Sequence, residues 1–176
     1  MRGLFEYGTP LDLDFYLRYH SSMKRQLAIV AAFALTLTVL GVTYGAGMKR
    51  KVVAPKDFPA GKPFSAGMQF GDTLYVSGST GADLKTGKVP DKFEDEVQLC
   101  FDNIGAIMKA GGYDFSDAVS VQVYLTDMTL FPRKNAVYTK VFPEPRPTRT
   151  TVGVTALAGA AHMEVTVTAR KQRYRL

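Results

Sequence analysis

The stretch AVSVQVYLTD, residues 118–127, indicates how the chain folds around it. Its apolar positions are Val119, Val121, Val123 and Leu125, and its polar positions are Ser120, Gln122, Tyr124 and Thr126. A period of two is that of a β-strand, in which successive side chains point to opposite faces of a sheet. We therefore expect a strand with one buried face and one polar face.

On the N-terminal side, residues 63–80 read PFSAGMQFGDTLYVSGST, with short apolar runs on either side of Gly71-Asp72. Glycine and aspartate at that position favour a β-hairpin turn. Residues 93–110 then place apolar side chains three and four positions apart, which predicts an amphipathic helix that ends at Gly111-Gly112. The helix positions are Val97, Cys100, Phe101, Ile104, Ile107 and Met108.

On the C-terminal side, an apolar stripe predicts a second helix between Thr129, which can cap it, and Pro143, which stops it. Alternating residues predict two further strands, at residues 149–154 and 162–171. The element order is then ββαβαββ. This order favours an α+β domain in which a sheet carries both helices on one face.

Residues 27–44 contain no charged side chain and lie between Lys24-Arg25 and a basic cluster at residues 49–51. A run of this length approaches the ~20 residues that cross a bilayer. Read from Met23, it also resembles a secretory signal peptide. Residues 23–48 are therefore predicted as a signal peptide or a transmembrane anchor, with a buried core helix as the alternative. Either of the first two places the domain outside the cytoplasm, secreted, periplasmic or membrane-anchored.

The segments on either side of this run carry weaker signals. Residues 1–22 have no clean period, and they are either a tail or the result of a start assigned too early, with Met23 as the true start. Residues 49–62 are rich in proline and lysine, which predicts an extended linker. The folded domain is expected over residues 63–176.

The composition narrows the possible chemistry. A chain of 176 residues that is 46% hydrophobic can bury one core without a metal or disulfides. Its single cysteine, Cys100, falls on the apolar side of the first predicted helix. His20 and His162 lack neighbouring ligands, so we expect no metal site. The net charge is +6, but the basic tail at residues 170–175 continues a strand pattern, which favours a solvated strand end over a nucleic-acid site.

No phosphate-binding loop, nucleophile elbow or zinc-binding motif occurs in the sequence. Polar residues at the predicted strand ends remain as candidates for a site. Arg149 opens an apolar strand and has the fork of donors that binds a carboxylate, although such an arginine is also a common edge residue. Glu164 lies between apolar neighbours, where a carboxylate can order a water or relay a proton, or simply occupy the wet face of a strand.

Several landmarks over residues 52–173 occur in the order found in the RidA (YjgF) family of imine deaminases, which this region resembles. They are Pro63-Phe64-Ser65, Leu74–Gly78, Val123–Met128, the helix segment Asn135–Tyr138, Pro147-Thr148-Arg149, and Glu164 fifteen residues later. The resemblance implies the small α+β fold also found in chorismate mutase, assembled as a homotrimer with clefts between subunits.

The resemblance also implies a reaction and a set of site residues. Family members hydrolyse reactive 2-imino or enamino acids, such as 2-aminoacrylate, to 2-oxo acids and ammonia without a cofactor. The arginine that binds the substrate carboxylate corresponds to Arg149, and the acidic residue corresponds to Glu164. The remaining substrate-binding positions correspond to Phe64, Ser77, Gly78, Asn135 and Thr151.

This chain departs from the family pattern at several positions. Phe64 replaces the usual tyrosine, and Thr151, Ala158 and Thr166 replace a common cysteine, a proline and a second acidic residue. These changes keep the carboxylate anchor and affect the expected substrate range. The alternative function is a non-catalytic small-molecule-binding or chaperone-like member of the same family.

Overall fold

A computed structural model describes residues 13–45 and 49–172. The chain divides into two compact units, residues 1–47 and 48–176. The predictions for residues 1–12, 46–48 and 173–176 lie outside the described residues.

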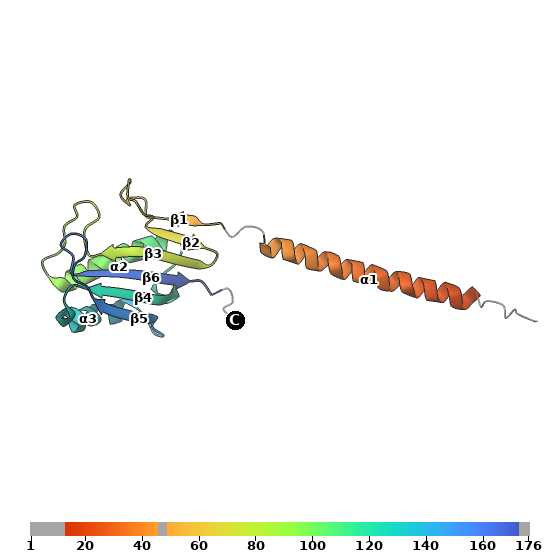
Figure 1. Ribbon diagram of the computed structural model, residues 1–176. Coiled ribbons are helices and arrows are strands. Elements are labelled where there is room, and N and C mark those ends of the chain that lie inside the picture. Colours follow the sequence, from red (N-terminus) through yellow and green to blue (C-terminus); the bar gives the residue numbers. More distant parts are fainter. Residues whose placement is uncertain (1–12, 46–48, 173–176) are drawn as a thin grey trace, which may run out of the picture. The chain divides into compact units, whose positions relative to one another are not determined.

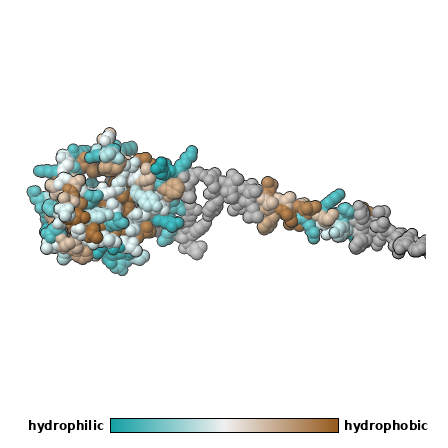
Figure 2. Space-filling model, viewed as in Figure 1, coloured by the Kyte–Doolittle hydropathy of each residue, from teal (hydrophilic) through white to brown (hydrophobic). Residues whose placement is uncertain are grey.

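The first unit contains the helix α1 (Leu13–Gly45). Of the apolar run 27–44, side chains are described as far as residue 36. In that part Leu27, Ile29, Val30, Phe33 and Leu35 each leave 64% or more of their surface exposed (Figure 2). Within the described residues, none of the helices has the length and apolar character needed to cross a membrane.

The second unit is built on a mixed six-stranded sheet in the order β1-β2-β3-β6-β4-β5 (Figure 1). Its strands are β1 (Lys51–Val53), β2 (Gly67–Phe70), β3 (Thr73–Thr80), β4 (Ala118–Leu125), β5 (Thr148–Gly153) and β6 (Met163–Arg170). β4 and β5 run parallel, and the other paired strands are antiparallel. The last strand therefore lies in the middle of the sheet, between β3 and β4.

Both helices of this unit, α2 (Phe93–Ala110) and α3 (Phe131–Val141), lie on the same face of the sheet (Figure 1). The core forms where α2 meets the inward-facing residues of the central strands. On β6 these are Met163, Val165, Val167 and Ala169, all almost fully buried. The intervening Glu164 and Thr166 are partly exposed on the opposite face. The predicted α+β fold with two helices on one face is confirmed.

The connection from β3 to α2 is fixed by side chains of α2 that bind the backbone of β3 and the residues after it. The thiol of Cys100, which is fully buried, donates to the carbonyl oxygen of Ser79 at 3.1 Å. The amide of Asn103 donates to the carbonyl oxygens of Thr80 and Ala82 at 3.1 and 3.0 Å. These bonds hold the end of β3 against the helix layer.

Three local features differ from the sequence expectation. The predicted linker contains β1, which pairs with β2, so the sheet begins before residue 63. Val119 is 46% exposed, because the register of β4 against β6 shifts between Ala118 and Ser120. Thr129 does not cap α3. Its amide instead binds the side chain of Asp127, which caps the short helix η2 (Met128–Leu130) that precedes α3.

Candidate functional site

Arg149 lies on β5, the edge strand, opposite Val121 of β4. Because Val121 is fully buried under the helices, the side chain of Arg149 points to the helix face. Its Nη1 donates to Asn135 Oδ1 of α3 at 3.0 Å, and its guanidinium carbon lies 4.5 Å from the ring centroid of Tyr138. Stacking and hydrogen bonding together fix the plane of the guanidinium.

Lys134 lies beneath this arginine and was not among the residues expected from the sequence. Its side chain is 0% exposed, and its Nζ donates to the same Asn135 Oδ1 at 3.0 Å. Burial, followed by the charge of Arg149, lowers the pKa of Lys134 to about 8. We refer to Lys134, Asn135, Tyr138 and Arg149 as the α3 cluster.

A surface cavity of about 360 Å³ adjoins the α3 cluster. Its lining residues are Asn135, Tyr138, Thr139, Arg146, Pro147 and Arg149. The described lining contains two arginines and no acidic side chain. Arg146 pairs with Glu144 outside the lining, so the charge that favours an anion there is that of Arg149. Thr151, two residues after Arg149, has a buried Oγ1 with no hydrogen-bond partner in the described part of the chain.

The other predicted site residues gather where β3 meets β6. The register of this pair shifts between Val76 and Ser79, and Gly78 lies within the bulge. A Cβ placed on Gly78 would lie 1.9 Å from Glu164 Oε1, so the glutamate carboxylate lies directly over the glycine backbone. Ser77 lies beside them, and its Oγ donates to the carbonyl oxygen of Ser65 at 2.7 Å. We refer to Ser77, Gly78 and Glu164 as the β3–β6 cluster.

Phe64 comes directly before Ser65, whose carbonyl oxygen accepts the hydrogen bond from Ser77. Its ring is 50% exposed and makes an edge contact with Phe58, with ring centroids 6.4 Å apart. The bond from Ser77 to Ser65 ties the backbone beside Phe64 to the β3–β6 cluster, and the role of the ring as a pocket wall stays a prediction.

The two clusters lie on opposite faces of the sheet. Glu164 alternates with Met163 and Val165, whose side chains are fully buried on the helix face, so its own side chain points to the open face. Arg149 points to the helix face, where it meets α3. Within one chain the structure therefore does not bring Arg149 and Glu164 together.

The comparisons with known proteins agree with this fold. The family model described as Endoribonuclease L-PSP matches residues 55–171. The chain belongs to the RidA (YjgF) family. The family region thus includes both clusters and the whole of the sheet except β1.

Individual relatives cover the same region. A RutC family protein of Saccharolobus solfataricus is 43% identical over 119 residues, which is 67% of this chain and 92% of the relative. A protein of Mus musculus named 2-iminobutanoate/2-iminopropanoate deaminase is 35% identical, over 66% of this chain and 87% of its own length. The crystal structure of E. coli TdcF with bound serine has a TM-score of 0.64 and 28% identity, over 69% of this chain and 99% of that one.

A buried acidic residue that the sequence reasoning missed supports the start of β6. Glu96 of α2 is fully buried and accepts the backbone N–H groups of His162 and Met163 at 2.6 and 3.2 Å. Its second oxygen lies 2.8 Å from His162 Nδ1. The clamp fixes the residues just before Glu164. A carboxylate on the apolar stripe of the predicted helix was the signal for it.

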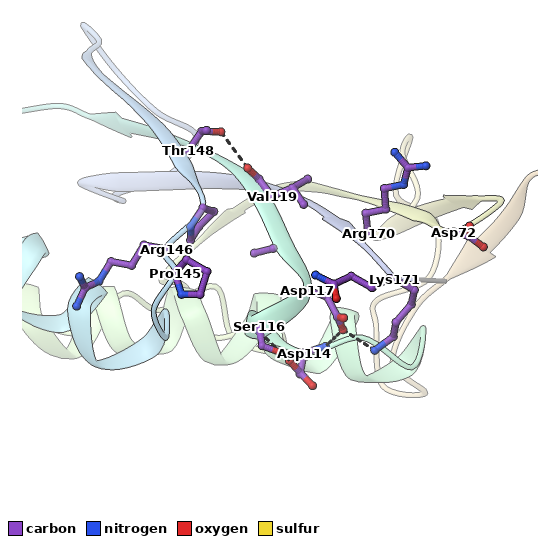
Figure 3. Close-up of a pocket in the computed structure, with 13 residues that line it drawn as sticks. Asp72, Asp114, Ser116, Asp117, Val119, Pro145, Arg146, Thr148, Arg170 and Lys171 are labelled. Carbon is purple, nitrogen blue, oxygen red and sulfur yellow. Dashed lines mark hydrogen bonds and ion pairs between the residues drawn. The ribbon is translucent and has the colours of Figure 1, made fainter. Parts of the chain in front are cut away.

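A second hollow shares Arg146 and Pro147 with the cavity beside the α3 cluster (Figure 3). It has a volume of about 1020 Å³ and forms where β4 and β5 begin and β6 ends. Among its charged side chains, Lys171 pairs with Asp117, and Arg146 pairs with Glu144. It contains none of the predicted site residues. Among the described residues, no group of three or more histidine, cysteine, aspartate or glutamate side chains could hold a metal ion.

Proposed function

We propose that this protein hydrolyses reactive 2-imino acids to 2-oxo acids and ammonia. The observation that carries the proposal is the guanidinium of Arg149, held by Asn135 and stacked on Tyr138 beside a cavity whose described lining has no acidic side chain. A planar guanidinium in this setting suits a carboxylate. Relatives at about 35% identity are named for this reaction.

The active site we propose is shared between copies of the chain in a homotrimer. Arg149 and Glu164 lie on opposite faces of one sheet, so a neighbouring subunit must supply one of them if both act on one substrate. Neither α2 nor α3 covers the open face of the sheet, where Tyr75 is 52% exposed. Covering that face with other copies satisfies the requirement for a second layer.

The chemical step needs little from the protein, because imines hydrolyse in water unaided. Water adds to the C2 carbon, a proton reaches the nitrogen, the C–N bond breaks, and ammonia leaves a 2-oxo acid. Arg149 would hold the carboxylate. Glu164 of a neighbouring copy would accept a hydrogen bond from the water or relay its proton. Phe64 and Thr151 would complete the walls of the pocket, and no step calls for a cofactor.

Ammonia release is the direct test. The full-length chain should accelerate ammonia release from 2-iminopropanoate generated in situ by an amino-acid oxidase. Arg133→Ala is the matched control for Arg149→Ala and should keep the wild-type rate. Arg133 also lies on α3, but it pairs with Glu94 through two hydrogen bonds of 2.7 and 2.8 Å. A wild-type rate equal to spontaneous hydrolysis would contradict the proposal and favour a non-catalytic binding role. Cleavage of an RNA strand by the same sample would support the activity named in the family description instead.

The assembly has its own test. Light scattering on the full-length chain should give a mass near three times 19.3 kDa. A monomer at micromolar concentration would remove the shared site, and with it the joint role of Arg149 and Glu164.

We also propose that residues 48–176 act outside the cytoplasm. The support is the uncharged run 27–44 and the basic residues on either side of it. Fractionation of cells that express a C-terminally tagged chain tests this placement. A full-size chain in the soluble cytoplasmic fraction would contradict it.

A further inference from the structure

Lys134 carries a charge that the domain buries without an opposite charge. Its side chain is 0% exposed, and its Nζ lies 4.4 Å from the ring centroid of Phe131. The described part of the chain places no carboxylate within ion-pair distance of this ammonium. The hydrogen bond that the structure gives it goes to Asn135 Oδ1, a neutral acceptor. Burying an ammonium without a counterion costs several kcal/mol in general, so it calls for a reason.

The surroundings of Lys134 increase that cost. The charged group that faces it is the guanidinium of Arg149 on β5, and both cations donate to the same oxygen of Asn135 at 3.0 Å. The other titratable group nearby is Tyr138 on the same helix, whose ring centroid lies 5.6 Å from Nζ. On the adjoining helix α2, Glu94 is already paired with Arg133. An anion is thus the missing component of the cluster.

We propose that Lys134 is a positioning residue of the carboxylate site: its buried amine orients Asn135 and Arg149 through their shared oxygen and takes up a proton when a carboxylate binds. The inference rests on the proposed carboxylate site at Arg149, but it concerns binding and is independent of turnover. The ligand class that satisfies it is a small monocarboxylate that meets two cations.

The direction of the pH effect follows from linkage. The pKa of Lys134 is about 8 in the free protein, and a bound carboxylate raises it because the negative charge favours the ammonium. The bound state therefore holds more protons than the free state. Affinity is full below about pH 8 and falls as the pH rises towards the bound-state pKa, by at most ~10-fold per pH unit.

The test measures binding of pyruvate, a product of the proposed reaction, to the full-length chain between pH 7 and 9.5. Pyruvate stays ionised throughout this range, so any pH dependence belongs to the protein. We expect the wild-type Kd to rise above pH 8, with proton uptake seen by calorimetry in two buffers of different ionisation enthalpy. Lys134→Met should bind more weakly at pH 7 and show no pH dependence over the range. Lys140→Met, at an exposed lysine of the same helix, should behave as wild type.

A second measurement tests the proposal even if Lys134→Met fails to fold. With ¹³C-labelled lysine, one wild-type side-chain resonance, assigned by its loss in Lys134→Arg, should titrate near pH 8 and shift to higher pH with pyruvate. Pyruvate binding with an unchanged pH slope in Lys134→Met would overturn the role of Lys134 alone. The absence of pyruvate binding by the wild type at every pH would overturn the carboxylate site itself, and this proposal with it.

Discussion

The α3 cluster and the β3–β6 cluster differ in charge, in neighbours and in the face of the sheet on which they lie. In the α3 cluster, two cations share one amide oxygen and pack against aromatic rings. In the β3–β6 cluster, the carboxylate of Glu164 lies over the backbone of Gly78, which has no side chain to occupy that space. The first is suited to hold an anion, and the second to handle a proton or a water. The proposed carboxylate anchor and the proposed proton relay are therefore separated within one chain, and the site we propose would need surfaces from two chains.

The largest effect should come from the anchor of the α3 cluster. Arg149→Ala should lower kcat/KM by roughly 10³-fold, because it removes a charged bidentate contact to the substrate. Arg149→Lys should also lose most activity, since an ammonium cannot reproduce the fork of donors. Initial rates of ammonia release, with light scattering to show that both variants assemble, check this. Equal rates in Arg149→Ala and wild type would refute the carboxylate-anchor role.

A smaller loss is expected from the β3–β6 cluster. Glu164→Gln keeps the size and one acceptor oxygen but cannot take up a proton, so activity should fall about 10²-fold, the lower end for general acid–base assistance. Single-turnover rates measure the chemical step. Wild-type rates in Glu164→Gln would leave only water positioning to this residue. Wild-type rates in Glu164→Ala as well would remove it from the reaction.

Gly78→Ala tests whether the glycine acts through the glutamate. The new methyl group would occupy the position of Glu164 Oε1, at 1.9 Å, and should move the carboxylate. We expect activity to fall about tenfold, because a displaced catalytic group loses alignment. In the Glu164→Gln background the same change should have little further effect, and a double-mutant cycle measures that coupling. Additive losses would separate the two residues, and the thermal unfolding midpoint shows whether the fold is retained.

The smallest predicted loss comes from an experiment that tests whether Arg149 and Glu164 of one site belong to different subunits. Arg149→Ala and Glu164→Gln chains, each nearly inactive, are unfolded, mixed in equal amounts and refolded together. If each site takes Arg149 from one subunit and Glu164 from another, random assembly leaves about a quarter of the sites intact. The mixture should then recover about a quarter of wild-type activity. No recovery in mixed trimers would place both residues in one chain's site.

The central strands of this fold could be predicted from the sequence, because their burial alternates residue by residue. Residues 163–170 show this in the structure, where a buried residue is followed by a partly exposed one along most of the strand. The pairing of strands could not be predicted in the same way. That β6 enters the sheet between β3 and β4 depends on contacts between distant segments, which a local period does not contain. β1 is only three residues long and was hidden among prolines and lysines.

The site residues also divide into those that could be predicted from the sequence and those that depend on tertiary contacts. Arg149, Asn135 and Glu164 were expected from the family resemblance, and the structure gives their contacts. Lys134 could not be recognised, because a lysine on a short helix is ordinarily solvated, and its burial depends on tertiary packing that the local sequence does not contain. His162 is exposed, and its bond to Glu96 joins it to a helix more than sixty residues away in the chain, a contact that a local pattern does not contain.

Because the thiol of Cys100 is unreactive, the fold of residues 48–176 does not depend on the redox conditions around it. It is fully buried, it donates to the carbonyl oxygen of Ser79, and burial raises its pKa well above the usual range. A thiol that stays protonated and out of reach of solvent neither attacks a disulfide nor is readily oxidised. Residues 48–176 contain no other cysteine. The domain therefore needs no oxidant to form a disulfide and no reductant to keep its thiol reduced. The same sequence can therefore fold on either side of a membrane.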